Sequence, residues 1–118
     1  MSFIGYNNDG SSDRYEVIHL AVYGRDVFDE WFEDLRDVVG KTVILRRLSR
    51  LAYGNFGDHR PVGCGVWEIR IHYGPGYRIY YGEEGSRIIL LICGGDKGTQ
   101  KRDIQRAQQF WTSYLREK

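Results

Sequence analysis

A chain of 118 residues can bury one real core, and a content of 42% hydrophobic and 28% charged residues is typical of a folded globular protein. The formal net charge of +1 excludes a globally basic protein, so any nucleic-acid site must be a local cluster of cations. The chain has no signal-peptide pattern, no long apolar run, and no cysteine or histidine spacing typical of metal ligands. We therefore expect a cytoplasmic protein without a membrane span, a metal site or a cofactor.

The first 14 residues are rich in Gly, Ser, Asn and Asp, and this composition predicts a flexible leader. The remaining residues, 15–118, contain no linker, repeat or low-complexity tract, so we expect them to form a single domain. The first run of this domain, Tyr15 to Val22, suits a β-strand.

Two amphipathic helices are expected after this strand. Asp26 can cap a helix that runs to about Asp37 and carries acidic side chains outside its apolar stripe. A second helix, over about 41–53, has a basic ridge formed by Arg46, Arg47 and Arg50. This ridge could contact RNA phosphates or an acidic partner, or it could pair with the acidic first helix, which is the interpretation we favour.

The stretch 67–80 predicts the β-hairpin around which the chain is organised. Apolar and polar residues alternate strictly at its start, and Gly74-Pro75-Gly76 reverses the chain direction. A three-residue loop would pair His72 with Arg78, and Arg70 with Tyr80. One face would be apolar and meet the core. The other face would carry Glu68, Arg70, His72, Arg78 and Tyr80.

Two interpretations fit this polar face. Guanidinium groups match phosphate oxygens, and aromatic rings stack on bases, so the face could bind RNA. It could equally be an ordinary solvated face on which Glu68 pairs with Arg70 or Arg78.

Residues 87–93 are apolar on both faces, which predicts a central strand covered on both sides. Lys97 would emerge at a sheet edge near the hairpin, and Thr99 can cap a last helix over about 100–117. His59 and Arg60 would lie on an irregular strand beside the hairpin. The element order β-α-α-β-β-β-α indicates an α+β fold, with an antiparallel sheet of about four strands, an N-terminal helix pair on one face and a C-terminal helix.

Five motifs, in the order in which they occur along the chain, resemble those of a known toxin family. They are G-N-F-G-D at 54–58, the E-I-R and G-P-G-Y-R of the hairpin, L-L-I-C-G-G-D-K at 90–97 and D-I-Q-R-A at 103–107. Over roughly residues 15–115 the chain resembles the phage-derived addiction module killer protein family, a HigB-like branch of the RelE/ParE toxin superfamily. The resemblance implies the RelE/ParE-like fold and the toxin role in a type II toxin–antitoxin pair.

The resemblance also implies an activity and partners. RelE-like toxins cleave messenger RNA, commonly on the ribosome and without metal, and a small helix-turn-helix antitoxin, here HigA-like, neutralises them. The expected function is thus a metal-independent endoribonuclease that uses ribose 2′-hydroxyl attack and arrests translation. Two alternatives are a ParE-like toxin that inhibits DNA gyrase and an inactive relic that binds an antitoxin.

Family roles transfer only where positions match. The phosphate-contacting arginine of the G-Y-R motif falls on Arg78, and two further basic positions fall on Arg70 and Lys97. A lysine expected on the preceding strand is replaced by Glu68, and the tyrosine expected early in the last helix has no counterpart near Asp103. The identity of the general acid and base is therefore left open by the resemblance.

The candidate roles follow from the chemistry of RNA cleavage. Arginines can stabilise charge on the phosphate, and Lys97 can bind the phosphate or stabilise the leaving group. Histidine is a common proton-transfer residue, so His72 could act as a base or an acid, while Tyr80 could stack on a base or donate a proton. Alternatively, His72 is a surface residue near the turn and Tyr80 is a packed cross-strand aromatic. The catalytic candidates are Arg70, His72, Arg78, Tyr80 and Lys97. The RNA-binding candidates are Arg46, Arg50, His59 and Arg60.

Overall fold

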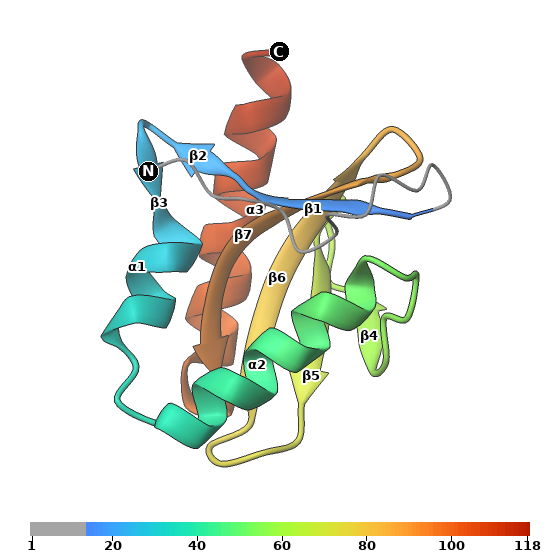
Figure 1. Ribbon diagram of the computed structural model, residues 1–118. Helices are drawn as coiled ribbons and strands as arrows, with labels where there is room; N and C mark the ends of the chain where they lie inside the picture. Colours follow the sequence, from blue (N-terminus) through green and yellow to red (C-terminus); the bar gives the residue numbers. More distant parts are fainter. Residues whose placement is uncertain (1–13) are drawn as a thin grey trace.

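The structure is a computed structural model that describes residues 14–118, so the leader expected at 1–14 lies outside the described residues except for Arg14. It is an α+β fold with a five-stranded sheet and three helices (Figure 1). The sheet order is β1 (Glu16–His19), β7 (Ile88–Asp96), β6 (Tyr77–Glu84), β5 (Trp67–Ile71) and β4 (His59–Pro61). The short strands β2 (Ala21–Val22) and β3 (Arg25–Asp26) pair with each other. The helices are α1 (Val27–Asp34), α2 (Val38–Leu51) and α3 (Gln100–Arg116), and the 3-10 turn η1 (Lys97–Thr99) precedes α3.

The sheet is mixed, so the expectation of an antiparallel sheet is wrong. β1 runs parallel to β7, with Val17 opposite Ile89. Parallel neighbours need a long crossover, which the intervening helices and hairpin strands supply here. The apolar run in β7 is buried along most of its length between β1 and β6, which confirms the predicted central strand.

The two N-terminal helices are separated by a second capping aspartate. The Asp29 backbone N–H donates to the Asp26 side chain (2.9 Å), which confirms the predicted cap of α1. Asp37, expected near the end of this first helix, instead accepts from the Gly40 N–H (2.8 Å) and caps α2. As a result α1 ends at Asp34, and α2 begins earlier in the chain than its hydrophobic pattern alone suggested.

The helices cover the two faces of the sheet and produce two hydrophobic clusters. On one face, Ile69 and Ile79 pack in a cluster with Phe28 of α1 and Leu48 of α2. This arrangement confirms the prediction that the apolar hairpin face meets the first two helices. On the other face, α3 contributes side chains such as Trp111 to the second cluster.

The hairpin has a longer loop than expected. β5 ends at Ile71 and β6 starts at Tyr77, so residues 72–76 form a loop of five residues, in which Gly74 and Gly76 adopt positive φ values of 57° and 79°. The predicted pairing of His72 with Arg78, and of Arg70 with Tyr80, is therefore wrong. The true register still keeps Arg70 and Arg78 on one face, because the longer loop preserves the side-chain parity of both strands.

Candidate anion-binding site

Two arginines lie directly opposite each other on the sheet face that α3 covers. They are Arg70 on β5 and Arg78 on β6. The side chain of Arg70 is 33% exposed, whereas that of Arg78 is only 7% exposed. The Nε of each side chain is buried and has no hydrogen-bond partner among the described residues. Buried N–H groups are normally paired, and like charges opposite each other repel, so this pair is suited to an anionic ligand.

The groups that hold the two guanidiniums make only long contacts with them. Arg78 Nη1 donates to the Gly76 carbonyl at 3.4 Å, and its Nε lies 3.9 Å from a carboxylate oxygen of Glu68. Arg70 Nη2 donates to Asp58 Oδ1, also at 3.4 Å. Such distances are at or beyond the limit of a good hydrogen bond. The carboxylates of Glu68 and Asp58 therefore balance the charges of the two arginines. Part of the hydrogen-bonding capacity of the arginines stays unused.

Glu68 is the centre of a buried hydrogen-bond network on the same face. Its fully buried carboxylate accepts hydrogen bonds from Arg60 Nε (3.0 Å), from the Tyr80 hydroxyl (2.9 Å) and from Gln100 Nε2 (2.9 Å). Burial works to raise the pKa of Glu68, but these hydrogen bonds outweigh it and hold the pKa below its usual value. Glu68 is thus an ionised carboxylate that ties β4, β5, β6 and α3 together.

Of the two interpretations of Tyr80, the packed cross-strand aromatic is confirmed, and the residue that stacks on a base is wrong. Its ring is fully buried in the cluster under α3, and its hydroxyl donates to Glu68. Burial and the neighbouring Glu68 charge raise the pKa of the phenol well above its usual value. A ring without an exposed surface cannot stack on a base, and such a phenol gives up its proton less readily than a free one.

His72 lies in the hairpin loop rather than on the strand face predicted for it. Its side chain is 71% exposed, and its Nε2 lies 2.6 Å from Asp58 Oδ2. The hydrogen bond from His72, aided by the charge of Arg70, holds the pKa of Asp58 below its usual value. Because an ionised carboxylate only accepts hydrogen bonds, Nε2 carries the hydrogen and Nδ1 is the nitrogen available to exchange a proton.

Lys97 emerges beside the hairpin loop, as the sequence predicts. It is exposed at the start of η1, directly after β7. A Cβ atom placed on Gly76 would lie 3.4 Å from Lys97 Cβ and 3.6 Å from Arg78 Nη1. Gly76 therefore lies close to both Lys97 and the guanidinium of Arg78, so these three residues belong to one region.

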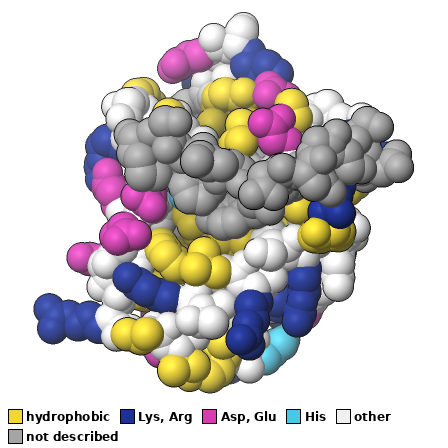
Figure 2. All heavy atoms as spheres, in the orientation of Figure 1, with side chains coloured by type: hydrophobic (Ala, Val, Ile, Leu, Met, Phe, Trp, Pro, Cys, Tyr) yellow, Lys and Arg dark blue, Asp and Glu magenta, His cyan; other side chains and the backbone are white. Residues whose placement is uncertain are grey.

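The four RNA-binding candidates are not brought together. Arg60 lies on the arginine face and is bound to Glu68, whereas His59 pairs with Ile69 and lies on the opposite face. Arg46 and Arg50 are exposed on α2, which covers that opposite face, and Figure 2 shows Lys and Arg side chains gathered there. Arg60 is thus the one RNA-binding candidate that lies on the same sheet face as Arg70 and Arg78.

The favoured pairing of the basic ridge with the acidic first helix is also wrong. Arg47 instead donates to the backbone carbonyls of Arg70 and Phe56, each at 3.1 Å. Within residues 14–118, no ion pair joins α2 to an acidic residue of α1. Arg47 thus links α2 both to β5 of the hairpin and to the loop before β4.

Two residues of the site were missed by sequence reasoning. Asp58, which binds both His72 and Arg70, is the last residue of the G-N-F-G-D motif, where an acidic side chain close to a cationic site could have been noticed. Gln100, which binds Glu68, is the first residue of α3 and gave no signal beyond its place after the predicted cap.

The predicted side-chain cap from Thr99 is absent, because the Thr99 hydroxyl instead donates to Asp103.

The structure also bears on metal and membrane binding. Among residues 14–118, no group of three or more His, Cys, Asp or Glu side chains is placed to hold a metal ion. No helix in this part of the chain has the length and apolar composition needed to cross a bilayer.

Comparison with known proteins identifies a relative. An uncharacterized protein of Haemophilus influenzae is 43% identical to this chain over 81 residues, which are 69% of this chain and 82% of the relative. No protein-family model matches the sequence. The relative's description assigns no activity.

Proposed function

We propose that this chain, which belongs to the same family as the uncharacterized Haemophilus influenzae protein, is the toxin of a type II toxin–antitoxin pair and cleaves messenger RNA. The observation that carries the proposal is the pair of opposed arginines, whose buried Nε groups lack acceptors among the described residues. A phosphodiester group supplies the oxygens that these donors lack, and guanidinium forks match its geometry.

The fold supports the assignment to a HigB-like branch of the RelE/ParE superfamily. Apart from the short strands β2, β3 and β4 and the turn η1, the described elements follow the order β-α-α-β-β-β-α that the sequence pattern predicts. Both N-terminal helices contribute to the cluster on one sheet face, and α3 contributes to the other. In the proposed RelE/ParE-like topology, α1 and α2 are the N-terminal helix pair.

The proposed reaction is metal-independent attack of a ribose 2′-hydroxyl on the adjacent phosphate. The new bond closes a 2′,3′-cyclic phosphate, the bond from phosphorus to the 5′-oxygen breaks, and this oxygen leaves as a hydroxyl group after it takes up a proton. Charge accumulates on the phosphate oxygens in the transition state, where Arg70 and Arg78 act as preorganised donors and Lys97 stabilises the leaving group. His72, oriented by Asp58 and exposed in the loop, is the proposed proton-transfer residue. Tyr80 has no proton-transfer role in this proposal, because it holds Glu68 in place.

The proposed partners follow from this activity. The substrate is mRNA on the ribosome, which places the protein in the cytoplasm, and the neutralising partner is a HigA-like helix-turn-helix antitoxin. The encounter with RNA would depend on salt, because phosphate contacts displace counterions.

Cleavage of mRNA by the purified protein, freed of bound metal by EDTA and then dialysed into the magnesium buffer that the supplied ribosomes need, tests the proposal. Wild-type protein should cleave, Arg70→Ala should lose at least about a hundredfold in rate, and Arg36→Ala should match wild type as a control for lost surface charge. Intact transcripts together with DNA-damage signalling in arrested cells would replace this proposal with the gyrase-inhibitor alternative. Intact transcripts and normal growth would favour the antitoxin-binding relic.

A further inference from the structure

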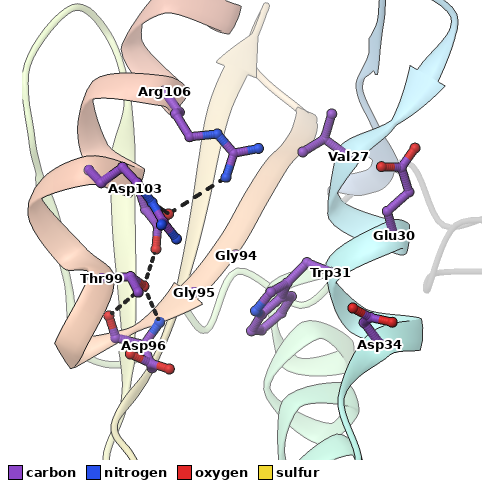
Figure 3. A pocket seen from close by; sticks show the side chains of 11 residues that line it. Val27, Glu30, Trp31, Asp34, Gly94, Gly95, Asp96, Thr99, Asp103 and Arg106 are labelled. Carbon is purple, nitrogen blue, oxygen red and sulfur yellow. Dashed lines mark hydrogen bonds and ion pairs between the residues drawn. The ribbon is translucent and has the colours of Figure 1, made fainter.

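A cleft of about 400 Å³ lies between α1 and the start of α3, with β7 at its floor (Figure 3). Trp31 of α1 forms one wall, Asp103 and Arg106 of α3 form the other, and Gly94 and Gly95 lie between them. Neither arginine of the proposed RNA site lines this cleft. The cleft is therefore separate from the proposed RNA site.

The floor of the cleft is a part of β7 that has a strand on only one side. β1 pairs with β7 from Ile88 to Leu91 and then leaves the sheet, whereas β6 pairs with β7 as far as Asp96. From Cys93 to Gly95, β6 is thus the only strand partner within residues 14–118, whereas the backbone of Asp96 is also bound to the Thr99 hydroxyl. An unpaired strand edge offers N–H and C=O groups to an extended peptide, which can add to the sheet as a further strand.

The charges around the cleft favour a cationic ligand. Two arginines line it, but they are outnumbered by four carboxylates, those of Glu30, Asp34, Asp96 and Asp103, of which Glu30 is already paired with Arg25. A polyanion such as RNA would meet repulsion from this excess of negative charge. A Lys or Arg side chain would meet complementary charge.

Asp103 has unused hydrogen-bonding capacity in this cleft. Its side chain is 1% exposed, and its Oδ2 accepts from the Thr99 hydroxyl. Its Oδ1 has no hydrogen-bond partner among residues 14–118, where the nearest cations, Arg102 Nε and Arg106 Nη1, lie 3.6 and 3.7 Å away. Buried carboxylate oxygens are normally hydrogen-bonded, so this acceptor points to a ligand with N–H donors.

Trp31 adds an aromatic surface for the same kind of side chain. Its ring packs so closely over Gly94 that a Cβ atom there would lie 2.3 Å from it. The ring is only partly buried and lines the cleft. An indole face attracts Lys and Arg cations more strongly than the other aromatic rings do.

We infer that this cleft binds an extended segment of a partner protein that carries a Lys or Arg side chain. The segment pairs with the free edge of β7, and its basic side chain lies among Trp31, Asp34 and Asp103. The inference goes beyond the proposed function and holds whether or not the protein cleaves RNA.

Titration of the isotope-labelled full chain with capped hexapeptides, followed by NMR, tests this inference. The probe is Ac-VTVKVT-NH2, and the matched controls are the same peptide with Glu in place of Lys and the Lys peptide with methylated backbone nitrogens. The Lys peptide should shift the Gly94 and Gly95 amides and the Trp31 indole N–H in a saturable way. Both control peptides should bind more weakly.

Two variants locate the binding. Asp34→Lys, at the exposed C-terminal end of α1, should weaken binding of the Lys peptide about fivefold, whereas Glu33→Lys, which changes the neighbouring residue outside the cleft, should not. A lysine is well tolerated at a helix C-terminus, so both variants should fold. The inference is overturned by the absence of saturable shifts at millimolar peptide, by equal binding of the Glu peptide, by unchanged binding to Asp34→Lys, or by an RNA oligonucleotide that shifts these resonances instead.

Discussion

Arg70 and Arg78 face each other across β5 and β6, and the Nε of each is buried without an acceptor among the described residues. The two side chains differ in exposure: Arg70 is partly open to solvent, whereas Arg78 is almost enclosed. An alanine variant of Arg70 therefore tests RNA cleavage, whereas an alanine variant of Arg78 also tests folding.

Arg70→Ala should abolish most RNA cleavage and leave the fold intact. Losing one donor to a developing phosphate charge costs about 3 kcal/mol, on the order of a hundredfold or more in rate. Single-turnover cleavage measures the loss, and urea unfolding should show a midpoint close to wild type. A rate within about twofold of wild type would contradict the role of the arginine pair.

Arg78→Ala should lose cleavage and also lower the free energy of unfolding. The sequence suggested a side chain pointing away from the core, but the structure encloses it beside Glu68. Removing one partner of a buried charge pair typically costs about 3–5 kcal/mol, and the remaining Arg60 contact should keep the loss at the low end. Arg78→Lys keeps the charge but not the fork, so it should recover stability more than cleavage.

Glu68→Gln should destabilise the protein at neutral pH and flatten its acid unfolding. The pKa of Glu68 is lowered in the folded state, so the folded protein binds this proton less readily than the unfolded chain does. The stability that depends on the carboxylate is therefore present above the unfolded pKa, near 4.5, and is lost as the pH falls through the lower folded value. Urea unfolding between about pH 3 and pH 7 measures this contribution.

The exposed Glu83 on β6 provides the matched control for this variant. Glu83→Gln should change neither the stability at neutral pH nor its dependence on acid. An acid dependence in Glu68→Gln equal to that of wild type would show that this carboxylate does not contribute.

His72→Gln should reduce cleavage by about a hundredfold if His72 transfers a proton, since positioned acid–base groups contribute at least that much. Asp58→Asn should have a smaller effect and should move the pH dependence of the rate, because His72 loses its ionised partner. His59→Gln is the matched control, since His59 lies on the other face of the sheet. A pH–rate profile that is the same in Asp58→Asn and wild type would exclude coupling between this pair and the reaction.

Gly82→Ala should lower the free energy of unfolding by about 1–3 kcal/mol, the usual cost of overpacking. A Cβ atom at this position on β6 would lie 2.5 Å from the ring of Trp111, which is buried under α3. Thermal unfolding measures the change, with the exposed Ser86→Ala as the control. A wild-type Tm in Gly82→Ala would show that α3 can move away from the sheet at little cost.

The alternation of residues in the hairpin was enough to assign its faces. Ile69 and Ile79 face α1 and α2, and Arg70 and Arg78 share the other face, although the predicted register was wrong. Side-chain direction in a strand depends only on the local backbone, and the longer loop preserved the parity of the two strands. The cap at Asp26 was equally predictable, because a capping interaction spans only three residues.

Tertiary structure alone decided which polar residues are buried. Glu68 and Tyr80 are enclosed because α3, distant in sequence, packs over their face and places Gln100 against the carboxylate. The parallel position of β1 and the free edge of β7 likewise depend on where the chain returns after a long crossover. Local pattern assigns a residue to a face, but only long-range packing determines whether that face is covered by solvent, by a helix or by a ligand.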